Sequence, residues 1–143
     1  MNSANDPFTH MLHAYRDAVF ARDVEAFVRL YDANVHVFDM WGEWSMQGIA
    51  AWRRMAEGWF GSLGDERVRV TFDDVESFVD EAMVCGYATL TYSALAPDGT
   101  VVRSLSNRMT VVMQRRGDDW KVVHEHTSAP IEHETLKARL QRG

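Results

Sequence analysis

The sequence has few of the residues that cross-link or anchor a protein. Its 143 residues include a single cysteine, Cys85, so neither an internal disulfide nor a cysteine cluster for zinc or iron–sulfur can form. No apolar run approaches the roughly 20 residues that a membrane-spanning helix needs. The start, "MNSANDPFTH", lacks the basic and apolar regions of a secretory signal. We therefore expect a cytoplasmic protein that does not engage a membrane.

Basic residues are also in the minority. There are 15 Lys and Arg against 21 Asp and Glu, which gives a formal net charge of −6. Because no stretch concentrates positive charge, nucleic acid is not expected as a partner. The hydrophobic fraction of 46% and charged fraction of 25% are those of an ordinary globular protein. We expect one domain over residues 1–143, in which 131–143 form an exposed C-terminal tail or helix.

The first half of the chain has a helical period of apolar residues. Asp6 and Pro7 are typical of a helix start, because Asp accepts hydrogen bonds from the first turn and Pro fits the first helical position. Apolar residues then recur at spacings of three and four up to Val19. The pattern goes on to predict a second helix over 24–31, a turn at 32–34, a strand over 35–40 and a third helix over 48–60.

From Glu66 onward the pattern changes to strand alternation. Four strands are predicted, over 66–72, 82–95, 101–115 and 120–128, with Asp73-Asp74 as a break. The turns "APDGT" and "RGDD" join antiparallel neighbours. This order predicts an α+β fold in which three N-terminal helices pack inside a curved, mostly antiparallel sheet around a cone-shaped cavity. The other sheet face would pair two chains through alternating apolar residues: Val68, Val70, Leu90, Tyr92, Val102 and Val112.

Asp39 and Tyr15 are candidates for proton-transfer chemistry. Asp39 continues the apolar row of Val35 and Val37, and a carboxylate facing an apolar cavity loses hydration, so its pKa rises toward values useful for a general base. Tyr15 lies on the inward face of the first helix, where its buried hydroxyl needs a partner. The alternative is an Asp near solvent at a strand end and a core Tyr bound to backbone.

His124 and His126 lie two residues apart in the last predicted strand, so alternation places them on one face. Ser128 shares that face, whereas Glu125 points away from it. Inward imidazoles could form hydrogen bonds, transfer protons or simply pack in the interior. A metal site would need a third ligand, and none has the required spacing, so neither a metal nor another cofactor is predicted.

Several further residues are candidates for the wall of a pocket. They are Trp41, Trp44, Trp52, Met55, Trp59, Asn107, Arg108 and Val111. Tryptophans at helical spacing suit a core as well as a pocket, and Arg108 alternates away from Asn107 unless a bulge swaps the faces. An aromatic and methionine-rich cavity would suit a small hydrophobic or aromatic molecule.

Residues 15–42 resemble, without a gap, the nuclear-transport-factor-two-like superfamily, which includes SnoaL-like proteins and ketosteroid isomerases. Tyr15 falls where the isomerases carry their oxyanion-hole tyrosine, and Asp39 where they carry the aspartate that moves the proton. The stretch "QGIAAWRRM" (47–55) is similar to the helix that follows in many members. The resemblance implies a cystatin-like topology, usually in a homodimer.

The C-terminal half leans toward other members of that superfamily. The stretch "RRGDDWKVVHEHTSAP" (115–130) resembles the SnoaL-like subgroup and the association domain of calcium/calmodulin-dependent protein kinase II. The resemblance implies that the last strand, with His124 and His126, lines the pocket. It also places Val111 where the isomerases carry a second acid, and valine can donate no hydrogen bond, so only the amide of Asn107 remains as a weak substitute.

Two classes of function follow from these residues. In the first, a pocket binds a small hydrophobic molecule, and Asp39 abstracts a proton beside a carbonyl without a cofactor, as in an isomerase, cyclase or dehydratase. In the second, the domain is a non-enzymatic association module that pairs through its sheet face. Both classes predict a homodimer.

Overall fold

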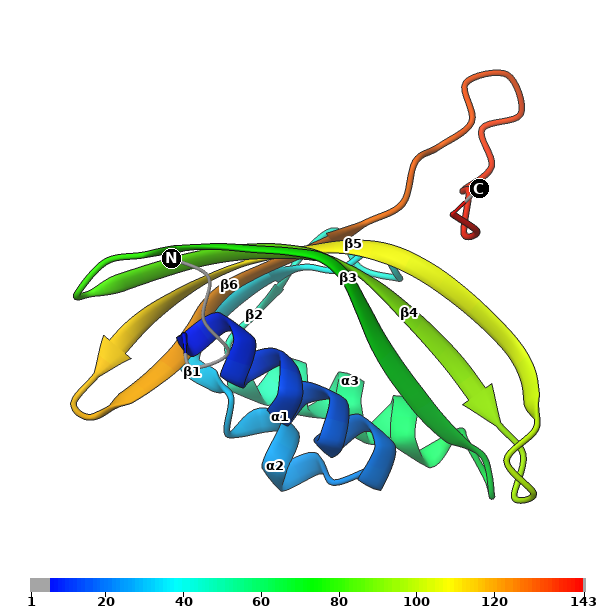
Figure 1. The fold of residues 1–143 in the computed structure, drawn as a ribbon, viewed down its shortest axis with the longest axis horizontal. Helices are drawn as coiled ribbons and strands as arrows, with labels where there is room; N and C mark the ends of the chain where they lie inside the picture. Colours follow the sequence, from blue (N-terminus) through cyan, green and yellow to red (C-terminus); the bar gives the residue numbers. More distant parts are fainter. Residues whose placement is uncertain (1–5, 143) are drawn as a thin grey trace.

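The computed structural model describes residues 6–142, and in it three helices lie on the concave side of one curved sheet (Figure 1). The helices are α1 (Pro7–Ala21), α2 (Val24–Val28) and α3 (Ile49–Gly61). The strands are β1 (Tyr31–Phe38), β2 (Met46–Gln47), β3 (Arg67–Val79), β4 (Met83–Leu95), β5 (Val101–Arg116) and β6 (Asp119–Ser128). The predicted α+β class, with three helices against a curved, mostly antiparallel sheet, is confirmed.

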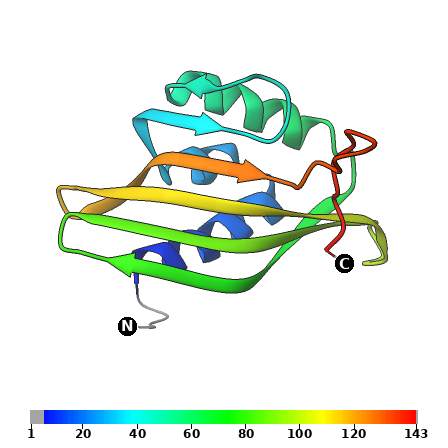
Figure 2. The same cartoon turned by 90° about the horizontal axis from the view of Figure 1, so that it is seen from above.

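The six strands form one mixed, open sheet in the order β2-β1-β6-β5-β4-β3 (Figure 2). Only β1 and β6 run parallel, and every other pair is antiparallel. The sheet curves over the helices without closing, because β2 and β3 are its two edges. The short strand β2 is an addition to the predicted elements. The parallel pairing of β1 and β6 joins two segments that are distant in the sequence and places the ends of both strands beside each other.

Side-chain caps fix the start of the two N-terminal helices. The Asp6 carboxylate accepts from Thr9 N at 2.9 Å, and the Asp23 carboxylate accepts from Ala26 N at 3.0 Å. Helix α2 ends at Val28, earlier than predicted, and Tyr31 already belongs to β1. The predicted turn at 32–34 is wrong, because these residues continue β1 through a register shift against β6.

The break predicted at Asp73-Asp74 is also absent. Strand β3 continues through it with a register shift between Asp73 and Glu76, and Asp74 takes a left-handed backbone with φ of 55°. Bulges of this kind bend a strand, and β3 is curved over the helices (Figure 1). The predicted turns at residues 96–100 and 116–119 are present between β4 and β5 and between β5 and β6.

The C-terminal segment after β6 is exposed and, among its described residues, not helical. It turns back through an isolated bridge between Ile131 and Ala138. Ser106 N then donates to Leu140 O at 2.8 Å, and the Gln141 side chain donates to Ser104 O at 2.8 Å. The segment therefore covers the part of β5 that extends beyond the end of β6. Over residues 6–142, no helix combines the length and the hydropathy needed to cross a membrane.

The core fills the space between the helices and the concave face of the sheet. Val68, Val70 and Leu90, which were predicted for the opposite face, are 5%, 1% and 0% exposed and belong to this core. Tyr92 also faces inward, whereas Val112 pairs with the outward His124 and Val102 is 49% exposed, so the six residues predicted for one face do not share it. The outer face instead carries exposed aromatic residues, among them Phe38 and Tyr87.

Gly86 lets the first helix approach the sheet closely. A Cβ atom at this position would lie 2.2 Å from Cγ of Phe8, whose ring is fully buried. We predict that Gly86→Ala destabilises the protein by about 1–3 kcal/mol through overpacking. The matched control is Gly58→Ala in α3, where a Cβ meets no atom within 4 Å, and it should stabilise by about 1 kcal/mol. Urea denaturation followed by circular dichroism measures both, and equal effects would contradict the close packing.

Candidate functional site

A cavity of about 460 Å³ lies between the concave sheet and the helices, a size that suits a small organic molecule. Its aromatic lining is Tyr15, Trp41, Trp52, Trp59 and Tyr92. Its polar lining is Asp39, Arg103, Ser104, Asn107, Glu125 and Thr127. Met55, Leu63, Val68, Ala94 and Leu105 complete the wall. Trp41 and Arg103 are also exposed, so the cavity reaches the surface near these two residues.

Asp39 faces this cavity directly after the end of β1. The strand places Val35 and Val37 inward, both fully buried, and Asp39 continues their row. Its Oδ1 accepts a hydrogen bond of 3.0 Å from Thr127 Oγ1, and Met40 N donates to the same hydroxyl at 2.9 Å. Loss of hydration raises the pKa of Asp39, although the hydrogen bond from Thr127 acts in the opposite direction. The carboxylate is therefore both oriented and made more basic.

Tyr15 pairs with a second cavity tyrosine. Its hydroxyl lies 2.9 Å from the hydroxyl of Tyr92, and either oxygen can be the donor. Burial raises the pKa of both phenols, so both stay neutral in the physiological range. The two hydroxyl groups carry one proton each, and only one of these protons makes the hydrogen bond between them. The other proton remains free to donate to an oxygen of a bound molecule.

Glu125 is a buried carboxyl group that the sequence reasoning placed on the wrong face. It is 1% exposed, lines the cavity, and accepts a hydrogen bond of 2.6 Å at Oε1 from the Tyr31 hydroxyl. Burial raises its pKa to about 8; the hydrogen bond from Tyr31 lowers it, and the charge on Asp39 raises it. The group is thus mostly protonated at neutral pH. It pairs across the sheet with Val111, the position where the resemblance to the isomerases implies a second acid.

The cause of this correction is a β-bulge at Val123. Val122 pairs with Met113 and His124 with Val112, so β6 uses two residue steps where β5 uses one. Before the bulge Val122 faces inward, and after it Glu125 and Thr127 do. His124 and His126 therefore face outward, where both rings pack against Phe38 at centroid distances of 4.9 and 5.5 Å. The His124 ring donates through Nδ1 to His36 O at 2.7 Å.

The structure also places four other predicted pocket residues away from the cavity. Trp44 is 97% exposed, and Val111 is fully buried in the core. Arg108 and Ser128 lie on the outer face, where Arg108 Nε donates to Ser128 Oγ at 3.1 Å. No bulge interrupts β5 between Asn107 and Arg108, so plain alternation holds there and sends Arg108 outward. Seven predicted residues do line the cavity: Tyr15, Asp39, Trp41, Trp52, Met55, Trp59 and Asn107.

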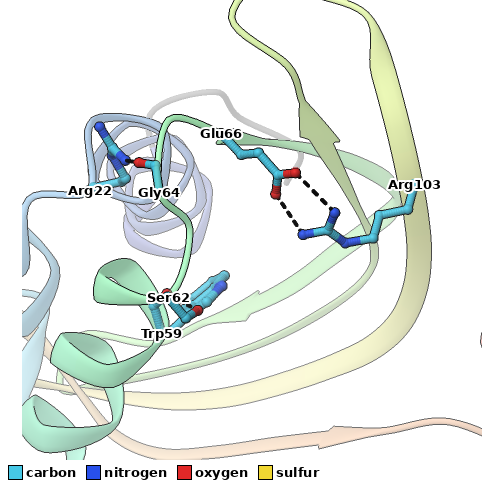
Figure 3. A network of polar contacts seen from close by, with 6 residues as sticks. All are labelled: Arg22, Trp59, Ser62, Gly64, Glu66 and Arg103. Atoms are coloured by element: carbon cyan, nitrogen blue, oxygen red, sulfur yellow. Dashed lines mark hydrogen bonds and ion pairs between the residues drawn. The ribbon is translucent and has the colours of Figure 1, made fainter.

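An ion pair bridges the mouth of the cavity. Glu66, in the segment after α3, accepts from Arg103 on β5 through both oxygens, at 2.7 and 3.2 Å (Figure 3). The same segment is held at its start by Ser62 Oγ, which donates to Trp59 O at 2.7 Å, and by Arg22, which donates to Gly64 O (Figure 3). The charge of Arg103 is thus directed toward Glu66 at the rim rather than toward the two carboxyl groups inside.

Two buried polar atoms of the lining have no hydrogen-bond partner among the described residues. They are Nε1 of Trp52, a donor, and Oδ1 of Asn107, an acceptor. An unpartnered buried polar atom is costly, so each marks a place where a bound molecule would supply the missing partner. Within residues 6–142, no group of three or more His, Cys, Asp or Glu side chains is arranged to hold a metal ion.

Glu125 should make the stability of the protein depend on pH. Its pKa is about 8 in the folded protein against 4.5 for the free group, so folded chains hold a proton that unfolded chains release. Stability is therefore lost as pH rises from about 4.5 to about 8. Relative to Glu125→Gln, which does not titrate, the wild type should lose on the order of 1 kcal/mol per pH unit in this window. Urea denaturation at pH 5, 6.5 and 8 measures the free energy of unfolding of both proteins. A difference between wild type and Glu125→Gln that stays constant with pH would refute the prediction.

Comparison with known proteins places the chain in a family. No protein with a curated description matches it. A protein of unknown function from Pseudomonas putida KT2440, described as NTF2-like, is 21% identical over 95% of this chain and 93% of its own, with a TM-score of 0.84.

Two further structures share the fold. A protein of Xanthomonas campestris, provisionally assigned as a calcium/calmodulin-dependent protein kinase II association domain, is 12% identical over 92% of this chain and 94% of its own, with a TM-score of 0.75. A protein of Novosphingobium aromaticivorans, provisionally assigned as a scytalone dehydratase, is 12% identical over 96% of this chain and 91% of its own, with a TM-score of 0.73. The family model of the SnoaL-like domain matches residues 9–132, and the chain therefore belongs to the SnoaL-like domain family.

Proposed function

We propose that the protein is a cofactor-independent enzyme that binds a small hydrophobic or aromatic carbonyl compound and uses Asp39 as its general base. The observation that carries this proposal is the position of Asp39, a carboxylate that faces an aromatic cavity and is oriented by Thr127. Loss of hydration raises the pKa of Asp39, which strengthens it as a base. Among the described residues no ion pair includes Asp39, and Arg103, the cationic residue of the wall, binds Glu66 instead.

The Tyr15–Tyr92 pair supplies the second half of the chemistry. When Asp39 removes a proton from the carbon beside a carbonyl, negative charge develops on the carbonyl oxygen. The free hydroxyl proton of the pair can donate to that oxygen, and such a donor in a low-dielectric site contributes far more than it would in water. The resulting enolate can be reprotonated elsewhere, can attack an internal electrophile or can expel a leaving group. These outcomes are isomerisation, cyclisation and dehydration.

The comparisons support this reading only at the level of the fold. A neighbour provisionally assigned as a scytalone dehydratase has the same architecture at 12% identity. The same fold also hosts a provisionally assigned association domain, so architecture does not decide between an enzyme and a module. The decision rests on the residues of the cavity.

We predict that Asp39→Asn strongly slows exchange of the α-protons of a ketone fused to an aromatic ring. The assay follows the loss of the α-proton signals of 2-tetralone in D₂O by proton NMR. It requires no knowledge of the natural substrate. Loss of a general base should slow exchange by about 10²–10⁴-fold. The matched control is Asp118→Asn in the exposed turn between β5 and β6, which should exchange at the wild-type rate. Exchange by the Asp39→Asn variant at the wild-type rate would remove Asp39 from the mechanism.

We also propose that the outer sheet face pairs two chains. In an enzyme this pairing would accompany catalysis, and in the alternative, a non-enzymatic association module, it would be the function itself. Phe38, Phe78 and Tyr87 are 38%, 61% and 44% exposed, and Phe78 packs on Tyr87 with ring centroids 6.3 Å apart. Scattered single apolar residues are ordinary at a surface, but contiguous aromatic pairs on a sheet are typical of an interface.

Size-exclusion chromatography with light scattering should therefore give a homodimer at micromolar concentration. Tyr87→Asp should shift it to a monomer, because a charge in the interface would be left unpaired. Leu136→Asp, at a residue of the C-terminal segment that is 76% exposed against 44% for Tyr87, should leave the dimer intact. A monomeric wild type is the outcome that contradicts this proposal.

A further inference from the structure

We propose that Glu125 is the general acid of the cavity, working opposite Asp39, and that the substrate is a β-hydroxy carbonyl compound from which the pair eliminates water. The proposal rests on the role proposed for Asp39 and adds the proton donor, the substrate class and the type of reaction.

The placement of the two carboxyl groups suits an acid and a base on one substrate. Thr127, which orients Asp39, is the next inward residue after Glu125 on β6. Successive inward residues of a strand lie about 7 Å apart. Carboxyl groups in direct contact would share one proton, whereas inverting glycosidases place an acid and a base about 6.5–9.5 Å apart around the reacting atoms. The register of β1 against β6 places Asp39 beside Thr127 and one inward step beyond Glu125, so the backbone positions of the two acids are separated by about the span of the reacting carbons and oxygen.

The surroundings of Glu125 keep it protonated and ready to donate. Facing it are Tyr31 and Asp39 from β1 and its end, Tyr15 from α1, and Tyr92 from β4, none of which is a cation. From β5 it meets Val111. Burial and the charge of Asp39 both favour the neutral acid. Asp39, less buried and bound by a hydroxyl donor, is the group of the pair that ionises first.

One oxygen of the acid remains available to a substrate. Tyr31 occupies Oε1, and no other hydrogen bond from a described residue reaches this carboxyl group. Tyr31 therefore acts as a positioning residue that fixes the orientation of the group, and Oε2 is left for the cavity. In its neutral form the carboxyl can donate its proton from this free oxygen.

An unpartnered buried atom indicates the substrate class. Oδ1 of Asn107, in the wall of the cavity, needs a donor. A β-hydroxy carbonyl compound supplies it through its hydroxyl group, while its carbonyl oxygen accepts from the Tyr15–Tyr92 pair. A simple ketone would leave the Asn107 oxygen unpaired.

The reaction balances without an external reagent. Asp39 takes the α-proton, the C–H electron pair becomes the C=C bond, and the C–O bond breaks. The proton of Glu125 passes to the departing hydroxyl, which leaves as water. The products are an enone, a protonated Asp39 and an ionised Glu125, and proton exchange with solvent restores the starting state of both carboxyl groups.

The test compares two reactions in the same variants. Dehydration of 4-hydroxy-4-phenylbutan-2-one, followed by the absorbance of the enone, needs both the acid and the base. Exchange of the α-protons of 2-tetralone needs only the base. We expect Glu125→Gln to lower the ratio of the dehydration rate to the exchange rate by about 100-fold or more. Glu81→Gln, at an exposed residue between β3 and β4, is the matched control and should change neither rate.

Two further readouts separate chemistry from a structural role. Replacing the hydroxyl of the probe by acetate, which leaves without a proton, should restore most of the rate lost in Glu125→Gln. The wild-type dehydration rate should fall above about pH 8, and Tyr31→Phe should move this alkaline limb to higher pH because the ionised carboxyl loses a donor.

The outcomes distinguish this inference from the proposed function. Absence of Asp39-dependent exchange would overturn both. Exchange that depends on Asp39, together with equal loss of both reactions in Glu125→Gln, would overturn the role of Glu125 alone. So would failure of the wild type to dehydrate the hydroxy ketone while it still exchanges the tetralone.

Discussion

The candidate site depends on one extra residue in the last strand. Without the bulge at Val123, β6 would present His124 and His126 to the cavity and turn Glu125 and Thr127 outward. Thr127 would then no longer reach Asp39, and Tyr31 would lose its partner. A single register shift thus replaces two imidazoles by a carboxyl group and a hydroxyl. It also places the two imidazoles on the opposite surface, beside Phe38.

A buried carboxyl group has an energetic cost that this fold offsets only in part. Transfer of an ionised carboxylate out of water is unfavourable by far more than one hydrogen bond returns. Tyr31 offers one strong donor to Glu125, and no cation among residues 6–142 forms an ion pair with it, so the group escapes the penalty by keeping its proton. Asp39 lies nearer the surface and has a hydroxyl donor, so it can carry charge. Two chemically similar side chains therefore take different protonation states because of their surroundings alone.

Much of the framework could be predicted from the sequence because it depends on local patterns. The carboxylates of Asp6 and Asp23 accept hydrogen bonds from the first turns of their helices, and Gly99 and Gly117 lie in turns with positive φ. Asp39 and Tyr15 could be placed because each continues an apolar row on its own element.

The face of β6 could not be predicted, since both of its registers present a plausible inward row. Val122 and Val123 are equally apolar, and a pattern that buries a glutamate contradicts the usual rule for inward residues. The bulge is a property of the pairing between three strands, because β1 shifts its register against β6 at the same level. No single segment contains that information. Thr127 was missed because of the same bulge in β6. Tyr92 was predicted for the outer face because alternation along β4 does not show which side the helices cover.

The C-terminal segment gives the entrance of the cavity an unexpected dependence on the end of the chain. Leu140 and Gln141 bind the backbone of Ser106 and Ser104 on β5, and Ser104 and Leu105 belong to the cavity wall. Residues after the last strand therefore hold the part of β5 that contributes to the wall. Loss of Leu140 and Gln141 would release this part of the wall while leaving Asp39 and Glu125 in place.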